Sequence, residues 1–268
     1  MSYKVLVLDI DGTLTNSKKK ITANTKNALL NAQKKGVKVV LASGRPTQGI
    51  KPFADELELA RFGGYVLSFN GAVVTNYETK EEIYRKELPM EEVSSLYDAS
   101  KKYGLPILSY QGDDIVTEIV DDEYVEIEAR INQMPVRKVD NFVETVVDPV
   151  PKCLMVGEGD YLAKVEKEVN AAFGDRLNVY RSEPFFLEIM PQNIDKAYSL
   201  GKLLDHLGLT KEEMIACGDG FNDLSMIKYA GLGVAMGNAQ PIVKQNADYV
   251  TLTNDEDGVA SVINEFLF

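Results

Sequence analysis

VLVLDIDGTL, at residues 5–14, is the stretch that decides the fold. Its first four residues are continuously apolar and largely branched, which predicts a β-strand that is covered on both faces. Asp9 follows directly, and Asp11, Gly12 and Thr13 complete a loop after the strand. In open α/β sheets, ligands bind beyond the carboxyl ends of the strands. The stretch therefore predicts a buried strand with acidic residues at the end where a ligand would bind.

Apolar segments typical of buried strands alternate with helical segments on both sides of a central region. The predicted strands are residues 37–42, 65–69, 72–76, 214–217, 232–235 and 249–251. The predicted helices are residues 22–36, a stretch that begins at Pro46, residues 195–207 and 223–229, and one more before the last strand. Asn70-Gly71 predicts a hairpin turn. This alternation is the mark of an α/β fold with a doubly wound parallel sheet.

The chain changes character in its central region. Helices are predicted at residues 90–103, 124–132 and 161–173, and short strands at 107–110, 115–119, 154–156 and 177–180. Runs of strands with helices on one side predict a separate α+β domain. We therefore expect residues 88–186 to be inserted into a core made of residues 1–87 and 187–268.

The composition excludes some classes of partner. The 268 residues carry 29 Lys+Arg against 41 Asp+Glu, a net charge of −12, and such a surface repels nucleic acid and anionic membranes. The first apolar run is too short for a signal peptide, and no stretch approaches the length of a membrane span. A cytoplasmic location is therefore expected. Cys153 and Cys217 lie in apolar runs and are expected to be buried, reduced thiols.

Asp9 and Asp11 are two residues apart and precede a glycine, so their carboxylates can turn toward one small volume. A carboxylate can attack phosphorus and hold the phosphoryl group as an acyl phosphate. Two like charges at this spacing repel, which favours a bound divalent cation, and the second carboxylate is free to move a proton. The alternative is a strand–helix loop whose aspartates serve turn and capping chemistry only. The pattern DxDGT after an apolar strand favours phosphoryl transfer.

Two further segments are compatible with phosphate binding. Ser43 and Gly44 follow the second predicted strand, where a hydroxyl and an N–H group can donate to phosphate oxygens. Lys196 lies near the start of a predicted helix and can neutralise charge on a phosphoryl group. Taken singly, the first is typical of an ordinary strand–loop–helix turn and the second of a solvated surface lysine.

Asp219, Asn222 and Asp223 lie in GDGFND, directly after the predicted strand 214–217. Three oxygen-bearing side chains spaced by glycine at a strand end suit a hard cation. The alternative is a capped helix start, with Asn222 or Asp223 as the cap. Two such glycine–acid loops in one parallel sheet are hard to explain by capping alone.

Together, these motifs resemble those of the haloacid dehalogenase superfamily of phosphotransferases and, within it, the Cof-type sugar phosphatases. The resemblance covers essentially the full length and is carried, in order, by VLDIDGTL, LASGRP, SFNGA, FLEI, Lys196, GDGFNDLSM and GVAMGNA. It implies a Rossmann-like core with a cap domain inserted between the second and third motifs. The family often has glycine after the motif lysine, where this chain has Ala197, a residue that a helix tolerates well.

The resemblance implies a magnesium-dependent mechanism. Asp9 would be the nucleophile and a ligand of Mg²⁺, and Asp219 would bind the metal through its carboxylate. Asp11 would be the general acid and then the base, with its backbone carbonyl on the metal. Asp223 would support the metal or its waters. Transport ATPases of the superfamily have Thr in place of Asp11, and haloacid dehalogenases lack the second Asp, so Asp11 favours a phosphatase or a phosphomutase.

The resemblance also implies how the phosphoryl group is held. Ser43 and Lys196 would contact its oxygens, helped by the backbone N–H groups of Ile10 and Gly44, and Asn222 would touch the phosphate. The expected activity is hydrolysis of phosphomonoesters of small metabolites, with sugar phosphates, pyridoxal phosphate and flavin mononucleotide all open as substrates. A hexose phosphomutase and a non-catalytic binding or regulatory member of the fold remain the alternatives. The oligomeric state cannot be read from the sequence.

Overall fold

The computed structural model describes residues 3–268, which form two compact units. The core unit consists of the described residues up to Arg85 together with Asp195–Phe268, and the inserted unit is Lys86–Ile194. The inserted unit ends at Ile194 rather than at Phe186, because Phe186–Pro191 forms strand β11 and pairs antiparallel with two strands of that unit.

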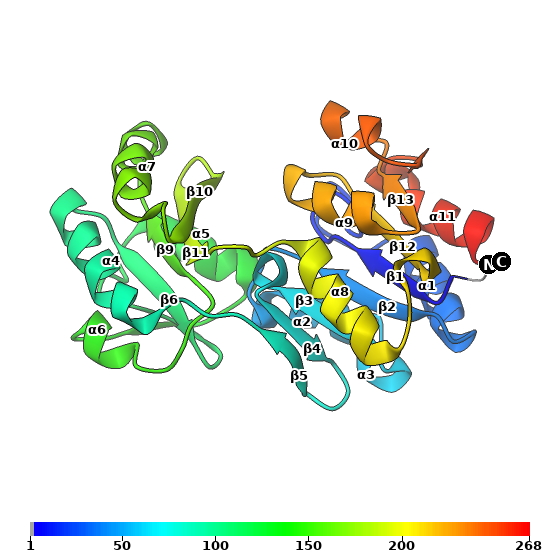
Figure 1. Cartoon of the computed structure of the whole chain (residues 1–268), viewed down its shortest axis with the longest axis horizontal. Helices are drawn as coiled ribbons and strands as arrows, with labels where there is room; N and C mark the ends of the chain where they lie inside the picture. Colours follow the sequence, from blue (N-terminus) through cyan, green and yellow to red (C-terminus); the bar gives the residue numbers. More distant parts are fainter. Residues whose placement is uncertain (1–2) are drawn as a thin grey trace. The chain divides into compact units, whose positions relative to one another are not determined.

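The core unit is built on an eight-stranded sheet in the order β14-β13-β12-β1-β2-β3-β4-β5 (Figure 1). The strands are β1 Val5–Leu8, β2 Lys38–Ala42, β3 Tyr65–Ser68, β4 Val73–Asn76, β5 Glu82–Arg85, β12 Met214–Gly218, β13 Leu232–Ala235 and β14 Tyr249–Val250. All neighbours from β14 to β3 pair in parallel, and β4 and β5 extend the sheet antiparallel. The predicted α/β fold class with a parallel sheet is confirmed.

Strand β1 lies in the interior of this sheet. It pairs with β2 on one side and β12 on the other, and Val5–Leu8 are fully buried, which explains why all four residues are apolar. The chain proceeds outward from β1 through β2 and β3, and later in the opposite direction through β12, β13 and β14. The strand order therefore reverses between β1 and β12, the position at which open α/β sheets bind ligands beyond the strand ends.

Helices cover the core sheet. They are α1 Ala23–Lys34, α2 Thr47–Glu56, α3 Leu59–Phe62, α8 Lys196–Leu207, α9 Leu224–Tyr229, α10 Pro241–Gln245 and α11 Gly258–Phe266. Helix α1 packs against α11, and α8 packs against α9. The side chain of Thr22 caps α1, where it accepts the Thr25 N–H at 3.1 Å. Asp195 caps α8 in the same way, which makes Lys196 the first residue of that helix.

Several segments of the core differ from the sequence prediction, and helices α3 and α11 are among those that were not predicted. Phe69–Gly71 forms a short 3₁₀ turn rather than a simple two-residue hairpin turn, and Asn70 adopts a left-handed backbone there. Strand β5 was not predicted. Its residues are exposed or half-buried at the edge of the sheet, so they lack the apolar pattern from which a strand is recognised.

The inserted unit contains a six-stranded sheet in the order β10-β11-β9-β6-β7-β8. Its strands are β6 Ile107–Gln111, β7 Asp114–Thr117, β8 Val136–Lys138, β9 Cys153–Val156, β10 Leu177–Glu183 and β11 Phe186–Pro191. Its helices are α4 Met90–Tyr103, α5 Glu123–Asn132, α6 Phe142–Thr145 and α7 Gly159–Phe173. The apolar sides of α4 and α7 share one core with alternate residues of the sheet. The short elements β8 and α6 were not predicted.

The face of the inserted sheet that points away from α4 and α7 carries buried polar residues. Lys152 and Glu188 form an ion pair at 2.8 Å, with only 4% and 9% of their side chains exposed. The second oxygen of Glu188 accepts the Ser182 hydroxyl at 2.8 Å, and nearby Tyr110 donates to Glu128 at 2.5 Å. Burial and the charge of Glu128 raise the pKa of Tyr110 well above its usual range. The charges of Lys152 and Glu188 thus compensate each other within the unit.

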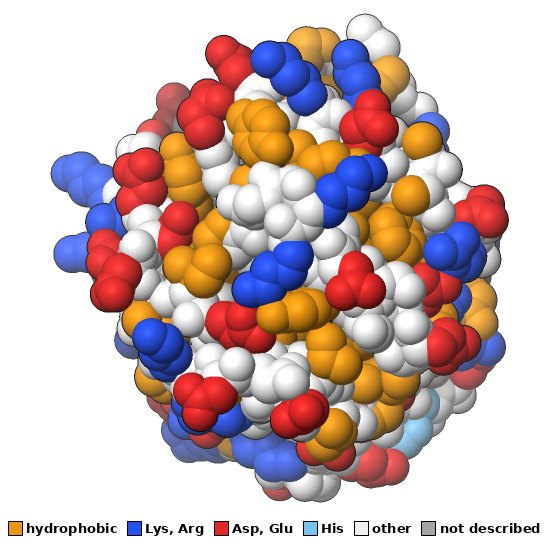
Figure 2. All heavy atoms as spheres, turned by 90° about the vertical axis from the view of Figure 1, so that its left-hand side faces the viewer, with side chains coloured by type: hydrophobic (Ala, Val, Ile, Leu, Met, Phe, Trp, Pro, Cys, Tyr) orange, Lys and Arg blue, Asp and Glu red, His pale blue; other side chains and the backbone are white. Residues whose placement is uncertain are grey.

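Acidic and basic side chains are interspersed on the face of the molecule drawn in Figure 2, with apolar side chains between them. The net charge of −12 is therefore not gathered into a single acidic area on this face. Within residues 3–268, no helix combines the length and the apolar character needed to cross a bilayer.

The Lys152–Glu188 pair gives a test of the inserted unit. Lys152→Met leaves the Glu188 carboxylate buried without its counter-charge, and we expect a loss of about 3–5 kcal/mol in the free energy of unfolding. The double variant Lys152→Met/Glu188→Gln should recover much of this loss because the uncompensated charge is removed. Urea unfolding followed by circular dichroism measures both.

Arg61→Met is the matched control for this experiment. It breaks the surface pair of Arg61 and Glu58, whose side chains are 68% and 42% exposed, and should cost less than about 1 kcal/mol. Equal losses for Lys152→Met and Arg61→Met would contradict the assignment of a buried, energetically coupled pair.

Candidate active site

The candidate site lies entirely in the core unit, at the carboxyl ends of β1 and β12. Asp9 directly follows β1, and its backbone N–H donates to the Cys217 carbonyl of β12 at 3.1 Å. Asp219 directly follows β12. The two predicted glycine–acid loops therefore meet at the point where the strand order reverses.

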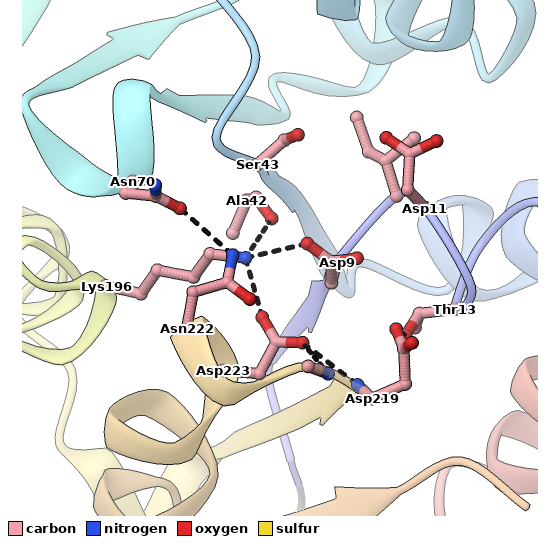
Figure 3. A network of polar contacts seen from close by, with 12 residues as sticks. Asp9, Asp11, Thr13, Ala42, Ser43, Asn70, Lys196, Asp219, Asn222 and Asp223 are labelled. Carbon is pink, nitrogen blue, oxygen red and sulfur yellow. Dashed lines mark hydrogen bonds and ion pairs between the residues drawn. The ribbon is translucent and has the colours of Figure 1, made fainter. Parts of the chain in front are cut away.

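Lys196 joins these loops through its ammonium group. Its side chain is completely buried, and Nζ donates to Asp9 Oδ1 at 2.7 Å, Asp223 Oδ1 at 2.6 Å and the Ala42 carbonyl at 2.8 Å (Figure 3). An ammonium has three donors, so all three have protein acceptors. Burial alone would lower the pKa of Lys196, but the charges of Asp223 and Asp9 raise it above its usual value, and the group is a fixed cation.

Asp223 is the second carboxylate on this ammonium and is also fully buried. Its other oxygen accepts the backbone N–H groups of Asp219 and Gly220, each at 2.9 Å. Asp223 therefore shapes the loop that carries Asp219 and orients Lys196 at the same time.

Asp219 faces the first loop. Its Oδ1 accepts the Thr13 hydroxyl at 2.8 Å, and Gly12 lies beside the same carboxylate. Gly12 has a φ of +89°, and a Cβ at this position would come within 2.4 Å of Asp219 Oδ2. A side chain would therefore be strained and would collide with the carboxylate, which explains the glycine of the DxDGT motif.

Negative charge exceeds positive charge in this cluster. Burial, followed by the charge of Asp223, raises the pKa of Asp9 well above its usual value, although the contact with Lys196 acts in the opposite direction. Burial also raises the pKa of Asp219 to about 6, and the neighbouring charge of Asp223 adds to the effect. The carboxylates thus lack enough cationic charge within the protein to be ionised at no cost.

A divalent cation fits this donor set. Asp9, Asp219 and Asp223 each offer a carboxylate oxygen within 4.8 Å of the others. Hard oxygen ligands of this kind are those that Mg²⁺ prefers, and its charge would offset the excess of carboxylates. Asp223, expected to support the metal indirectly, belongs to this group, whereas the carboxyl group of Asp11 does not.

The predicted phosphate-binding residues of the second motif lie at the end of β2. Ser43 is buried, and its hydroxyl accepts the Arg45 N–H at 3.2 Å. Gly44 lies against the amide of Asn70, where an added Cβ would be 3.2 Å away. Ile10 is fully buried between the two motif aspartates in the sequence.

Asn222 is exposed and lies across from the second motif. Its Nδ2 donates to Asn70 Oδ1 at 3.0 Å, and the Asn70 N–H donates to the Ser43 carbonyl at 2.9 Å. Asn70 thus contacts Ser43, Gly44 and Asn222, and Figure 3 shows its side chain joined to Asn222 by a hydrogen bond.

Asp11 stands apart from the Lys196 cluster. Figure 3 shows its carboxyl group turned away from Lys196 and Asp9. Arg45 donates to both of its oxygens, from Nε to Oδ2 at 2.7 Å and from Nη2 to Oδ1 at 2.9 Å. Lys19 adds a contact to Oδ1 at 2.9 Å. Burial would raise the pKa of Asp11, but the bonds and charges of these two cations lower it below its usual value.

Four polar residues of the site received no role from the sequence, namely Thr13, Lys19, Arg45 and Asn70. Thr13, Arg45 and Asn70 lie inside the DIDGT, LASGRP and SFNGA segments, so their place in the motifs was the available signal. Lys19 lies in the basic run of residues 18–20, which predicted a solvated loop or a weak contact to an anionic substrate, but not a contact with Asp11.

Known proteins resemble this chain over its whole length. The sequence profile of the haloacid dehalogenase-like hydrolases matches residues 6–263. The crystal structure of a haloacid dehalogenase-like hydrolase from Bacteroides thetaiotaomicron is 53% identical, with a TM-score of 0.96 over 98% of this chain and 99% of the other. The subclass IIB sugar phosphatase BT4131 is 31% identical, with a TM-score of 0.83 over 98% of each chain.

A curated relative is similar over an equal length. YcsE of Bacillus subtilis, a 5-amino-6-(5-phospho-D-ribitylamino)uracil phosphatase, is 31% identical over 275 aligned residues, which cover all of this chain and 97% of YcsE. Profile, sequence and structure agree with the family that the motifs predicted. The chain therefore belongs to the haloacid dehalogenase-like hydrolases.

Proposed function

We propose that this protein hydrolyses phosphomonoesters of small metabolites through a phosphorylated Asp9 and with bound Mg²⁺. The observation that carries the proposal is the buried Lys196 ammonium, which holds Asp9 at 2.7 Å beside two further carboxylates at the strand-order reversal. The family and the phosphatase names of relatives such as YcsE support the same chemistry.

Asp9 is the proposed nucleophile. Lys196 and the short connection from β1 fix its carboxylate, so little movement remains to be restricted when a phosphate binds. One carboxylate oxygen forms a bond to phosphorus while the bond to the leaving oxygen breaks, which gives an acyl phosphate on Asp9. Phosphoryl transfer of this kind depends mostly on positioning and on charge stabilisation.

Ser43 and Asn222 supply the polar contacts for the transferred group, and Lys196 supplies charge. Lys196 contributes a fixed positive charge beneath it, while Ser43 and the Asn70–Asn222 pair lie around the second motif. When bound by Asp9, Asp219 and Asp223, Mg²⁺ would supply further charge neutralisation at the phosphoryl oxygens.

Asp11 is the proposed acid and base. Its carboxyl group lies outside the metal cluster and is about one-third exposed, so it can exchange protons with a leaving oxygen and with water. It would protonate the leaving oxygen in the first step and take a proton from the water that hydrolyses the acyl phosphate in the second.

All substrates share the phosphoryl group and therefore its contacts with the core unit. We propose that the inserted unit sets the substrate specificity, that is, which leaving groups are accepted. Sugar phosphates and phosphorylated ribityl compounds are the proposed substrate classes, because related proteins are named for phosphatase activity on them.

Asp9→Asn should abolish phosphate release because an amide is a poor nucleophile, while its oxygen can still accept from Lys196 and keep the fold. Phosphate release from a panel of sugar phosphates and other phosphorylated metabolites, with Mg²⁺ present, measures the effect. Asp175→Asn, at a carboxylate that is 77% exposed in the inserted unit, is the control and should keep the wild-type rate. Undiminished release by Asp9→Asn would exclude Asp9 as the nucleophile.

The fate of the phosphate separates hydrolysis from mutase chemistry. Free phosphate without a bisphosphate activator supports the hydrolase. If the phosphoryl group instead moves to another position of the sugar, only when a bisphosphate is added and without release of free phosphate, the protein is a phosphomutase rather than a hydrolase.

Metal binding can be tested without turnover. Mg²⁺ should raise the melting temperature of the wild type, since a ligand of the native state stabilises it. Asp219→Asn should lose most of this shift because one anionic ligand is removed, whereas Asp205→Asn, at an exposed position of α8, should retain it. Differential scanning fluorimetry across a Mg²⁺ titration gives the comparison, and equal shifts in all three proteins would place the metal elsewhere.

A further inference from the structure

The two motif aspartates have different cationic partners, although only Ile10 separates them. Asp9 contacts Lys196 inside the core at 2.7 Å. Asp11 contacts Arg45 at 2.7 Å and Lys19 at 2.9 Å on the other side of the loop. The direction of each carboxyl group follows from its partner, because each hydrogen bond fixes the oxygen that it reaches.

Arg45 is held at several points besides its contacts with Asp11. Its N–H donates to the Ser43 hydroxyl at 3.2 Å, and its carbonyl accepts the Phe69 N–H at 2.9 Å. Its guanidinium lies over the Phe53 ring, with the carbon 5.5 Å from the ring centroid, and only 12% of the side chain is exposed. The guanidinium is therefore fixed before it meets Asp11.

The Arg45–Asp11 contact is bidentate. Two parallel N–H groups of the planar guanidinium reach the two oxygens of the carboxylate, at 2.7 and 2.9 Å. Such a pair sets both the direction and the rotation of the carboxyl plane, which a single contact from an ammonium does not. Carboxylate oxygens retain further lone pairs, so the pair leaves room for a proton or a water.

Lys19 makes a weaker contribution. Its side chain is 64% exposed, and an ion pair in that environment contributes little. Its backbone has a φ of 57° in the turn that Asn16 closes, with the Lys19 N–H on the Asn16 carbonyl at 2.9 Å. The turn therefore directs the ammonium toward Asp11, while Arg45 sets the carboxyl plane.

We infer that Arg45 is a positioning residue that holds the Asp11 carboxyl group outside the metal cluster, in the orientation needed for proton transfer. The inference rests on the proposed function. Without Arg45, only the exposed Lys19 would hold the Asp11 carboxyl group, which could then turn toward Asp9, Asp219 and Asp223 as a competing ligand. An acid that is not held within hydrogen-bond reach of the leaving oxygen loses most of its effect.

The dependence of the rate on the leaving group tests this role, because a purely structural role of Arg45 would affect all leaving groups equally. An alkyl phosphate such as glycerol phosphate needs a proton on its leaving oxygen, whereas p-nitrophenyl phosphate releases a stable anion. For Arg45→Met, we expect the single-turnover rate of Asp9 phosphorylation to fall by about 10- to 100-fold with the alkyl ester, within the range that general acid catalysis contributes. The rate with the aryl ester should change by less than about threefold, because little proton transfer is needed.

Three other variants sharpen the result. Arg45→Lys keeps the positive charge but cannot form the bidentate contact, and its rate with the alkyl ester should lie between those of the wild type and Arg45→Met. In an Asp11→Asn background, adding Arg45→Met should cause no further loss, because the residue through which Arg45 acts is already removed. Lys19→Met should show a small loss of the same kind, with Lys18→Met, its exposed neighbour, as the matched control at the wild-type rate.

The controls separate a positioning role from a failure to fold. Arg61→Met removes an equivalent charge from the surface and should match the wild type with both esters. Equal losses of Arg45→Met with both esters, or a further loss in the Asp11→Asn background, would overturn the positioning role and assign Arg45 to phosphate binding or to the fold. An unchanged Arg45→Met would overturn it as well. If the wild type phosphorylates Asp9 with neither ester, the proposed function itself fails, and the inference fails with it.

Discussion

The buried ammonium of Lys196 is the interaction on which the site depends. A buried lysine is tolerated only when its charge is compensated and its donors are satisfied. Asp9, Asp223 and the Ala42 carbonyl meet this demand; Asp9 and Ala42 lie at the ends of β1 and β2, and Asp223 lies in the turn that follows β12. Lys196 itself starts α8, directly after the chain returns from the inserted unit. One charge thus connects the segments that carry the chemistry.

The charge of Lys196 also makes the environments of the four aspartates differ. Lys196 offsets only part of the negative charge of Asp9, Asp219 and Asp223, so the cluster retains an affinity for a cation. Asp11 has cations of its own in Arg45 and Lys19, and its carboxyl group lies outside the cluster. Two aspartates of one short motif therefore occupy different electrostatic environments, as one loop needs if it is to offer both the proposed nucleophile and the proposed acid–base group.

The parts of this protein that local physics determines could be predicted from the sequence. The four apolar residues of β1, the Thr22 cap and the glycine–acid loops after β1 and β12 all follow from short-range patterns. The Asn70–Asn222 and Arg45–Asp11 contacts could not be predicted, because each joins distant segments and depends on the strand order. Strands β5 and β8 escaped notice because their residues are largely exposed and lack an apolar pattern, and nothing in a lysine signals the left-handed backbone of Lys19.

The central claim is that Asp9 carries the phosphoryl group during turnover. Rapid acid quenching of the enzyme with substrate and Mg²⁺, followed by borohydride reduction and peptide mass spectrometry, locates an acyl phosphate by converting the modified aspartate to homoserine. We expect homoserine at position 9 and unmodified Asp11, Asp219 and Asp223. Reduction at another carboxylate, or none during rapid turnover under conditions that trap a known acyl phosphate, would contradict it.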